Sequence, residues 1–301
     1  MKKILYISIL FIWAISIKLQ AQADLKTEYM TPSSFKSEDG ENLGSGSLYK
    51  ISGRYDLPIS TKLNSLGQPT SWMVSLAGSY GILQNDGAAT SFNPDKILNA
   101  GINITYMRPL SKKWMLVSTL GGGIYSSPDE IGAKSILVNG GAIFMYKVRK
   151  NFDLGIGLGL TNSFGPPIVM PIAVVNWHLS GKYEVRANIS NGMKIYGAMK
   201  LNDKFKVKLV AMEMDGMSAV MDIDGQSMIY SSLTIKSYLS PEYKIGKHST
   251  LYMNAGGAWL RSTSLTKRSL KDFFNNLFHD KDRNMDFYPA GYFAIGFKYK
   301  F

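Results

Sequence analysis

The sequence predicts an all-β fold: a transmembrane, antiparallel, up-and-down β-barrel of about 14 strands, with about 12 as the alternative, preceded by a cleaved signal peptide. Three observations predict it. The chain begins with a short apolar leader, its apolar and polar residues alternate with a period of two, and its last segment is an aromatic-rich strand. Strands cross lipid only as closed barrels, because no backbone group is then left unpaired.

The N-terminal segment has the organisation of an export signal. Two lysines precede an apolar run over residues 4–17, and small residues follow at Ala21 and Ala23. A run of about 14 residues is short for a membrane helix, which needs about 20. We therefore expect residues 1–23 to be a signal peptide that is cut after Ala21 or Ala23. Residues 24–301 are expected to form one outer-membrane barrel domain.

The composition agrees with export and with a barrel. The sequence has no cysteine, which excludes a lipoprotein anchor and a small disulfide-stapled fold. Its 29 Gly, 17 Tyr and 14 Phe suit a barrel with aromatic girdles. Removing Lys2, Lys3 and Lys18 from the 34 basic residues leaves 31 against 22 acidic ones, a net charge of +9. That charge favours anionic partners and selects no particular fold.

Alternation with a period of two organises the chain after the leader. In one segment Tyr49, Ile51 and Tyr55 fall on one face, and Lys50 and Arg54 fall on the other. The same alternation recurs in residues 72–82, 97–107 and 154–160. A strand that faces lipid on one side and water on the other requires this pattern.

Turn signals divide the chain into strands. Short polar turns occur at residues 111–113, 149–151, 180–182, 202–204 and 246–249, and Asn191-Gly192 is a strong hairpin signal. Longer polar loops are expected at residues 84–96, 127–134, 214–230 and 261–287, with a short helix at 266–279. Short periplasmic turns and long extracellular loops are typical of outer-membrane barrels. Counting back from the last strand then leads to about 14 strands.

The segment from Gly291 to Phe301 carries most of the prediction. One of its faces is continuously apolar and consists of Phe293, Ile295, Phe297, Tyr299 and Phe301. Soluble sheets rarely end on such a register, whereas the pattern resembles the signal by which the barrel assembly machinery recognises its clients. We therefore expect a protein of the bacterial outer membrane, with that machinery and outer-membrane lipid as partners.

Short motifs along the mature chain also carry a resemblance. They are Leu25-Lys26-Thr27-Glu28-Tyr29, Gly165-Pro166-Pro167 followed by Pro171-Ile172, and Asn202-Asp203-Lys204. In this order they resemble a family of uncharacterised bacterial outer-membrane barrels that is known only as a domain of unknown function. The resemblance covers nearly the whole mature chain and implies the barrel fold. It implies no reaction and assigns no functional residue.

Basic residues dominate the face that the alternation assigns to the lumen. The candidate pore-lining residues are Lys50, Arg54, Arg186, Lys194 and Lys236. Further lysines are expected there at positions 200, 206, 208, 298 and 300, although those near short turns also fit an interfacial position. Only Asp56 and Glu184 oppose them. A low-dielectric wall of one charge sign concentrates counter-ions, so we expect a passive channel or small-solute transporter that prefers anions.

The size of the lumen-facing residues leaves the state of the pore open. Glycines at positions 101, 155, 157 and 296 indicate space in the lumen, whereas tyrosines at positions 196, 238 and 292 indicate filling. The alternative function is therefore a structural or surface-interaction barrel without a pore. Its loops at residues 214–230 and 261–287 would then bind a partner.

Signatures of catalysis and of metal binding are weak. His178 and Ser180 have the spacing of an outer-membrane lipid hydrolase, with Asn191 as the third member, but a short periplasmic turn is the wrong place for that chemistry. Asp222-Ile223-Asp224-Gly225 lacks the distal glutamate of a calcium loop. We expect no enzyme, no catalytic residue, no metal site, no cofactor and no nucleic-acid partner. A lipid hydrolase remains the second alternative.

Overall fold

The structure is a computed structural model that describes residues 21–36, 41–64, 67–161, 168–190, 192–223, 225–269 and 284–301. Of the expected signal peptide only residues 21–23 fall within these ranges, and Gln22 and Ala23 begin the first strand. Among the described residues, no helix has both the length and the apolar character needed to span a bilayer.

Nearly all of the described chain is β-strand. The strands are β1 (Gln22–Lys36), β2 (Asn42–Leu63), β3 (Pro69–Gly87), β4 (Lys96–Pro109), β5 (Trp114–Ser126), β6 (Ile136–Arg149), β7 (Phe152–Thr161), β8 (Ile168–Leu179), β9 (Tyr183–Ser190), β10 (Gly192–Lys200), β11 (Phe205–Ile223), β12 (Gln226–Ile245), β13 (Ser249–Lys267), β14 (Asn284–Phe287) and β15 (Ala290–Lys300). Three short helical turns lie in connections: α2 (Ala89–Phe92), η1 (Pro128–Glu130) and η2 (Ala133–Ser135).

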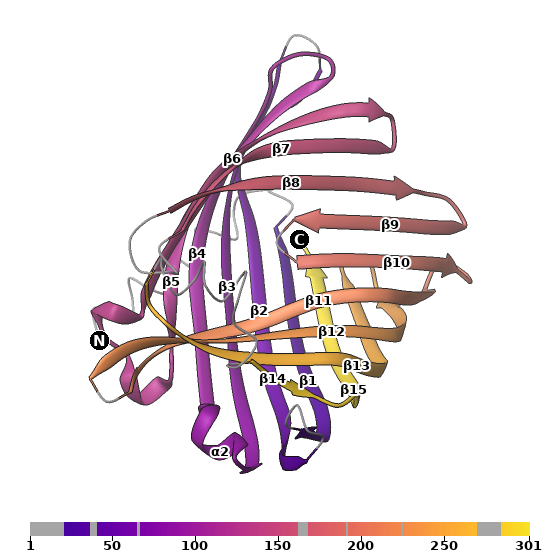
Figure 1. Ribbon diagram of the computed structural model, residues 1–301. Coiled ribbons are helices and arrows are strands. Elements are labelled where there is room, and N and C mark those ends of the chain that lie inside the picture. The colour runs from indigo at the N-terminus through magenta and orange to yellow at the C-terminus, as the bar shows by residue number, and fades with distance from the viewer. Residues whose placement is uncertain are drawn as a thin grey trace, which may run out of the picture.

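The strands form one closed antiparallel ring. Each strand from β1 to β13 pairs with the next, and β15 pairs with both β13 and β1. β14 lies between the same two neighbours, so β14 and β15 share one position and the 15 strands make a barrel of 14. The predicted fold class and the higher of the two predicted strand counts are confirmed. Figure 1 shows β2–β5 running steeply and β8–β13 running across the view, so the wall is strongly twisted.

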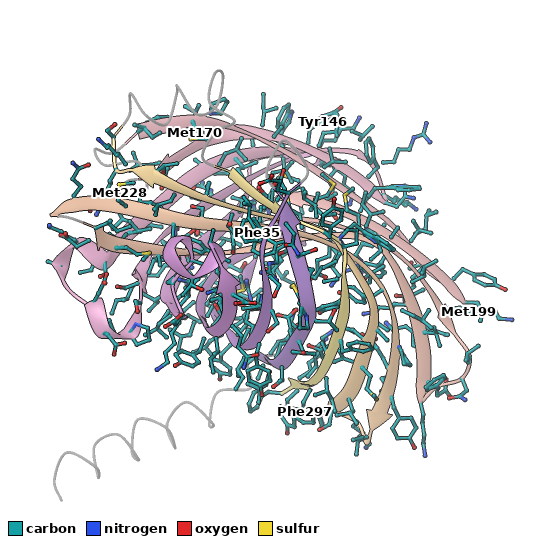
Figure 2. All side chains as sticks on the ribbon, turned by 60° about the horizontal axis from the view of Figure 1, so that its bottom comes forward. Phe35, Tyr146, Met170, Met199, Met228 and Phe297 are labelled. Atoms are coloured by element: carbon teal, nitrogen blue, oxygen red, sulfur yellow. The ribbon has the colours of Figure 1, made fainter. Side chains whose placement is uncertain are left out.

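The alternation separates an apolar outside from a packed inside. On β15, Phe293 and Ile295 are 51% and 49% exposed, whereas Tyr292, which precedes them and points inward, is fully buried. In Figure 2, Phe297 projects from the outside of the wall and Phe35 lies at the centre of the view. The outward face of the last strand consists of the predicted residues Phe293, Ile295, Phe297, Tyr299 and Phe301.

The two ends of the barrel differ in their connections. Both ends of the strand ring meet at one end, where Gln22 lies opposite Lys300. All five predicted short turns lie at this end, which we call the turn end. The opposite end, the loop end, contains α2, η1 and η2, in the predicted loops at 84–96 and 127–134. The helix expected at 266–279 falls largely outside the described residues, and Lys267 still belongs to β13.

The predicted loop at residues 214–230 is wrong. β11 and β12 run through it as a long antiparallel hairpin, and Gly225, just before β12, has a φ of +76°. A bulge between Val210 and Glu213 interrupts the alternation of β11. Beyond the bulge the strand carries Glu213 and Asp215, which pair with lysines of the distant strands β1 and β2 and of the neighbouring strands β10 and β12. An irregular, acidic segment of this kind has the local appearance of a loop.

β11 also divides the interior near the loop end. Its pairing with β10 ends at Glu213, and further along Val220 forms a parallel bridge with Ser126 of β5. Asn99 of β4 donates a hydrogen bond to the carbonyl of Ser218 (2.5 Å) and accepts one from its amide (3.3 Å). These contacts bring β11 onto β4 and β5 across the interior. β10 is too short to pair with this part of β11. The side chain of Asn99 therefore provides hydrogen bonds to backbone groups on the unpaired edge of β11.

The hydrophobic core fills the space that this contact encloses. It joins side chains from one side of the ring, β1–β4, to side chains from β11–β15 on the other. Its members are Met30, Leu48, Leu83, Ile97, Val210, Met217, Ala219, Tyr230, Tyr238, Ala258, Ala290, Tyr292 and Ala294. In this sector the loop-end half of the lumen is packed with side chains.

Candidate functional site

Six charged side chains meet inside the barrel at about the middle of the long strands. We call them the central charge network: Lys26 and Glu28 of β1, Lys50 of β2, Glu213 and Asp215 of β11, and Lys236 of β12. Lys236, Glu28 and Lys50 are 0%, 1% and 5% exposed. Three of these groups are ammonium groups and three are carboxylates, and Lys194 of β10 adds a fourth ammonium group at Glu213.

The ion pairs of the network interlock. Lys236 Nζ lies 3.0 Å from Glu28 Oε1 and 3.1 Å from Asp215 Oδ2. Lys50 Nζ contacts the same two acids at 2.9 and 2.5 Å. Lys26 adds a third cation 3.1 Å from Glu28 Oε1. Each carboxylate is therefore shared by at least two lysines, which ties β1 and β2 to β11 and β12 across the interior.

Two tyrosines complete the network. The Tyr292 hydroxyl donates to Glu28 Oε1 at 2.8 Å, and the Tyr238 hydroxyl donates to Glu213 Oε2 at 2.5 Å. The Lys236 ammonium also lies 4.8 Å from the centre of the Tyr292 ring. Buried charges remain ionised only where such partners replace water. The network is thus a built polar layer inside the lumen.

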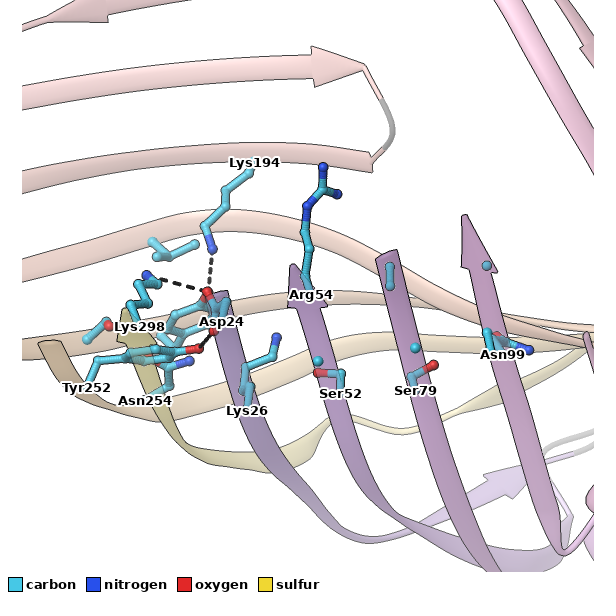
Figure 3. Close-up of a pocket in the computed structure, with 18 of the residues that line it drawn as sticks. Asp24, Lys26, Ser52, Arg54, Ser79, Asn99, Lys194, Tyr252, Asn254 and Lys298 are labelled. Atoms are coloured by element: carbon cyan, nitrogen blue, oxygen red, sulfur yellow. Dashed lines mark hydrogen bonds and ion pairs between the residues drawn. The ribbon is translucent and has the colours of Figure 1, made fainter. Parts of the chain in front are cut away.

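A charged cavity adjoins the network on its turn-end side. It has a volume of about 370 Å³, and we call it the vestibule. Its ionic lining comprises five cations and two carboxylates: Lys26, Arg54, Lys194, Lys208, Lys298, Asp24 and Glu242. Uncharged polar side chains complete the wall, among them Ser52, Ser79, Asn99, Asn103 and Asn254. Figure 3 shows Arg54, Lys194 and Lys298 around this space, on strands that lie on different sides of it.

The two vestibule carboxylates are shared among its cations. Glu242 Oε1 lies 2.6 Å from Lys208 Nζ and 3.4 Å from Lys298 Nζ. Asp24 accepts a 2.7 Å hydrogen bond from the Tyr252 hydroxyl and lies 4.0 Å from Lys298. Lys298 also lies 4.4 Å from the centre of the Tyr252 ring. The other three cations pair with acids that do not line the cavity: Lys26 with Glu28, Lys194 with Glu213 and Arg54 with Asp56. Cations therefore outnumber carboxylates on the cavity surface itself, although each cation has an acid partner.

The five candidate pore-lining residues fall in different places. Lys50 and Lys236 lie in the central charge network, and Arg54 and Lys194 line the vestibule. Arg186 is exposed on β9, opposite Tyr196 in the strand register, and does not line the vestibule. The structure thus brings four of the five together, in two adjoining groups.

Neutralising acids are what the sequence reasoning missed. On β1, Leu25, Thr27 and Tyr29 share the outward face. The alternation therefore already places Glu28 on the inner face. Glu213 and Asp215 were hidden by the bulge that made β11 look like a loop. An expectation of Asp56 and Glu184 as the only opposing charges is therefore wrong for the lumen as a whole.

Glycines on the inner face leave less space than predicted. A Cβ atom at Gly296 would lie 2.2 Å from the ring of Tyr252, and one at Gly155 would lie 2.3 Å from the sulfur of Met145. These glycines accommodate neighbouring side chains and not solvent. Gly101, in contrast, lines the vestibule.

The weaker candidate sites have ordinary structural surroundings. His178 lies near the end of β8, where its amide donates to the Asn151 carbonyl at 2.9 Å, and Ser180 follows in the next turn. Asp222 pairs with Lys134 at 3.3 Å. Asn191 and Asp224, which complete the two motifs, lie outside the described residues. Within the described ranges no three His, Asp or Glu side chains are grouped so as to hold a metal ion.

Comparison with solved structures finds membrane barrels at very low sequence identity. An outer membrane channel from Pseudomonas putida F1 is 8% identical with a TM-score of 0.43, covering 95% of this chain and 97% of its own. The NanC porin is 10% identical with a TM-score of 0.34, covering 93% and 100%. The outer membrane protease OmpT from Escherichia coli is 11% identical with a TM-score of 0.26, covering 96% and 100%. No curated protein matches the sequence significantly.

A family model matches nearly the whole chain, from residue 17 to residue 300. The match includes every described strand and both groups of lumen charges. The protein accordingly belongs to the family described as Domain of unknown function (DUF6268), and its described residues form a closed antiparallel β-barrel.

Proposed function

We propose that the protein is a passive outer-membrane channel for small anionic solutes, with the vestibule as its selective part. The observation that carries the proposal is the lining of the vestibule, in which five cations face two carboxylates. At an effective dielectric constant of about 20, an anion about 6 Å from one uncompensated cation is stabilised by about 3 kcal/mol. A few such charges are enough to favour anions over cations, although salt reduces the effect.

The path of the solute follows from the position of the charges. Short connections are typical of the periplasmic side of such barrels, so in this proposal the turn end and the vestibule face the periplasm. Lys26 belongs to both the vestibule and the central charge network. An anion in the vestibule therefore lies next to the central charge network, where carboxylates repel it and compete with it for the ammonium groups. We expect a small conductance because this layer is filled.

Conductance of the purified mature barrel in planar bilayers tests the proposal. Under a gradient of KCl we expect a reversal potential of the sign that chloride selectivity produces. Raising the salt concentration on both sides is expected to weaken the selectivity, since the vestibule charges are then screened. A cation-selective conductance would contradict the proposal.

A barrel without a pore is the second candidate, and the packed interior favours it. The core joins β1–β4 to β11–β15 and fully buries Tyr230 and Tyr292, and Lys236 is fully buried in the central charge network. A protein that inserts into bilayers as a folded barrel and carries no current would support this candidate and overturn the channel.

We also propose that the outward face of β15 is read by the barrel assembly machinery. Its terminal residue Phe301 is 49% exposed, and its ring packs against Tyr299 at 4.6 Å between centroids. Deleting Phe301 is expected to lower the amount of folded barrel in the outer membrane of cells severalfold. Refolding of the same variant into lipid vesicles without the machinery is expected to match the wild type. Equal loss in both assays would indicate a stability effect and contradict an assembly signal.

A further inference from the structure

Arg261 differs from every other fully buried cation among the described residues. It lies on β13 in the loop-end half of the barrel and is 3% exposed. Lys50 and Lys236 each contact carboxylates, whereas Arg261 takes part in none of the ion pairs of the described chain. Its Nη1 donates to the Gly46 carbonyl at 2.9 Å, and Nη2 has no hydrogen-bond partner.

The surroundings of this guanidinium are specific. Its central carbon lies 3.7 Å from the centre of the Phe287 ring, which packs in turn against Phe35. A Cβ atom at Gly46 would lie 2.7 Å from Nη2. The absence of a side chain at Gly46 thus allows the arginine to reach the backbone of β2 from β13. The guanidinium of Arg261 is thus fixed by the Gly46 carbonyl, while its Nη2 donor has no acceptor.

Two hydroxyl groups nearby are also without partners. Thr263 follows Arg261 on the same inward face of β13, and Tyr230 belongs to the adjacent strand β12, where Ser232 is the register partner of Thr263. Thr263 and Tyr230 are 1% and 0% exposed, and neither Thr263 Oγ1 nor Tyr230 Oη has a hydrogen-bond partner. In the strand register Tyr230 lies opposite Leu265, on the same inward face as Thr263 and Arg261.

We propose that Arg261, Tyr230 and Thr263 form a buried binding site for a small monovalent anion, with a halide as the simplest ligand. All three open groups can donate hydrogen bonds, and unpaired buried groups in native proteins mark the place of a bound ion or water. One uncompensated positive charge calls for one negative charge. The aromatic neighbours and complete burial restrict the ligand to a few atoms.

The site is independent of the proposed channel. The vestibule lies on the turn-end side of the central charge network, and Arg261 lies on the loop-end side, without lining the vestibule. The two anion positions are therefore separated by the buried layer of ion pairs. A test that locates the ion distinguishes them.

Anomalous scattering from bromide provides that test. Crystals of the full mature barrel grown in sodium bromide are expected to show a bromide peak within hydrogen-bonding distance of Arg261 Nη2 and Tyr230 Oη. An ordinary water there, with no anomalous signal, would overturn the site. A bromide peak confined to Arg54 or Lys298 would also overturn it, while supporting the anionic vestibule.

Stability in solution provides a second readout. The melting temperature of the detergent-solubilised barrel is expected to be higher in sodium chloride or bromide than in sodium gluconate at equal ionic strength, since a ligand of the native state stabilises it. Arg261→Met should remove the part of this rise that comes from the site. Tyr230→Phe and Thr263→Val, which keep the shape and remove one hydroxyl each, should reduce it, and they carry the test where Arg261→Met does not fold.

The matched control is Lys134→Met, which removes an exposed cation at the same end of the barrel. It should leave the halide effect unchanged. A halide effect that is absent in the wild type, or that survives in all three variants, would overturn the proposal.

Discussion

Lys236→Met is expected to destabilise the folded barrel by about 3–5 kcal/mol, the usual cost of removing one partner from a buried ion pair. Lys236 Nζ is fully buried between Glu28 and Asp215, at 3.0 and 3.1 Å. Methionine retains the length of the side chain, so packing is largely preserved. The loss leaves the fully buried Glu28 with Lys26 and Lys50 as partners and Asp215 with Lys50 alone. Urea unfolding in lipid vesicles, followed by tryptophan fluorescence, measures the change.

Two further variants separate charge from packing. Lys134→Met removes a lysine whose pair with Asp222 is exposed on both sides, and it should cost less than about 1 kcal/mol. The double variant Lys236→Met with Glu28→Gln removes one cation and one carboxylate together, so the net charge of the network returns to that of the wild type. It should be more stable than Lys236→Met alone. A Lys236→Met barrel as stable as the Lys134→Met barrel would show that the network contributes little.

Reversing two vestibule charges is expected to convert an anion-selective conductance into a cation-selective one. Arg54→Glu combined with Lys298→Glu changes the lining from five cations and two carboxylates to three cations and four carboxylates. The side chains of Arg54 and Lys298 are 56% and 41% exposed, so folding should tolerate the change. Every ~1.4 kcal/mol of altered ion stabilisation is a factor of about ten in the ion ratio. The reversal potential in a KCl gradient measures the effect.

A control with the same total charge tests whether position matters. Lys112→Glu combined with Lys247→Glu changes two exposed lysines in turns at the same end of the barrel. Neither residue lines the vestibule, so the selectivity should keep its sign. If this control reverses the selectivity as fully as the vestibule variant does, the overall charge of the barrel is responsible and the vestibule has no special role.

The sequence predicts one basic lumen, whereas the structure separates its residues into the central charge network and the vestibule. Lys50 and Lys236 are neutralised in the network and cross-link the strands. Arg54 and Lys194 face the cavity. Stability is therefore expected to respond to the first pair and selectivity to the second, which is why the two experiments use different residues.

Short-range patterns were enough to predict the barrel itself. The alternation of β15 and the five short turns depend on neighbours within one strand or one hairpin, and a period of two assigns each side chain to a face without knowledge of the rest. The strand count followed because the turns and the Asn191-Gly192 signal are local. The inward positions of Lys50 and Arg54 followed from the same register.

Only the tertiary structure decided what those inward residues meet. Glu28, Glu213 and Asp215 reach Lys50 and Lys236 from strands that are up to 208 residues apart, and a bulge at Val210 conceals the register of two of them. The approach of β11 to β5 depends on the shortness of β10, and the open donor of Arg261 depends on Gly46 across the interior. Charge balance inside a barrel is a property of facing walls. The period of a single strand identifies the face, and closure of the ring determines its partners.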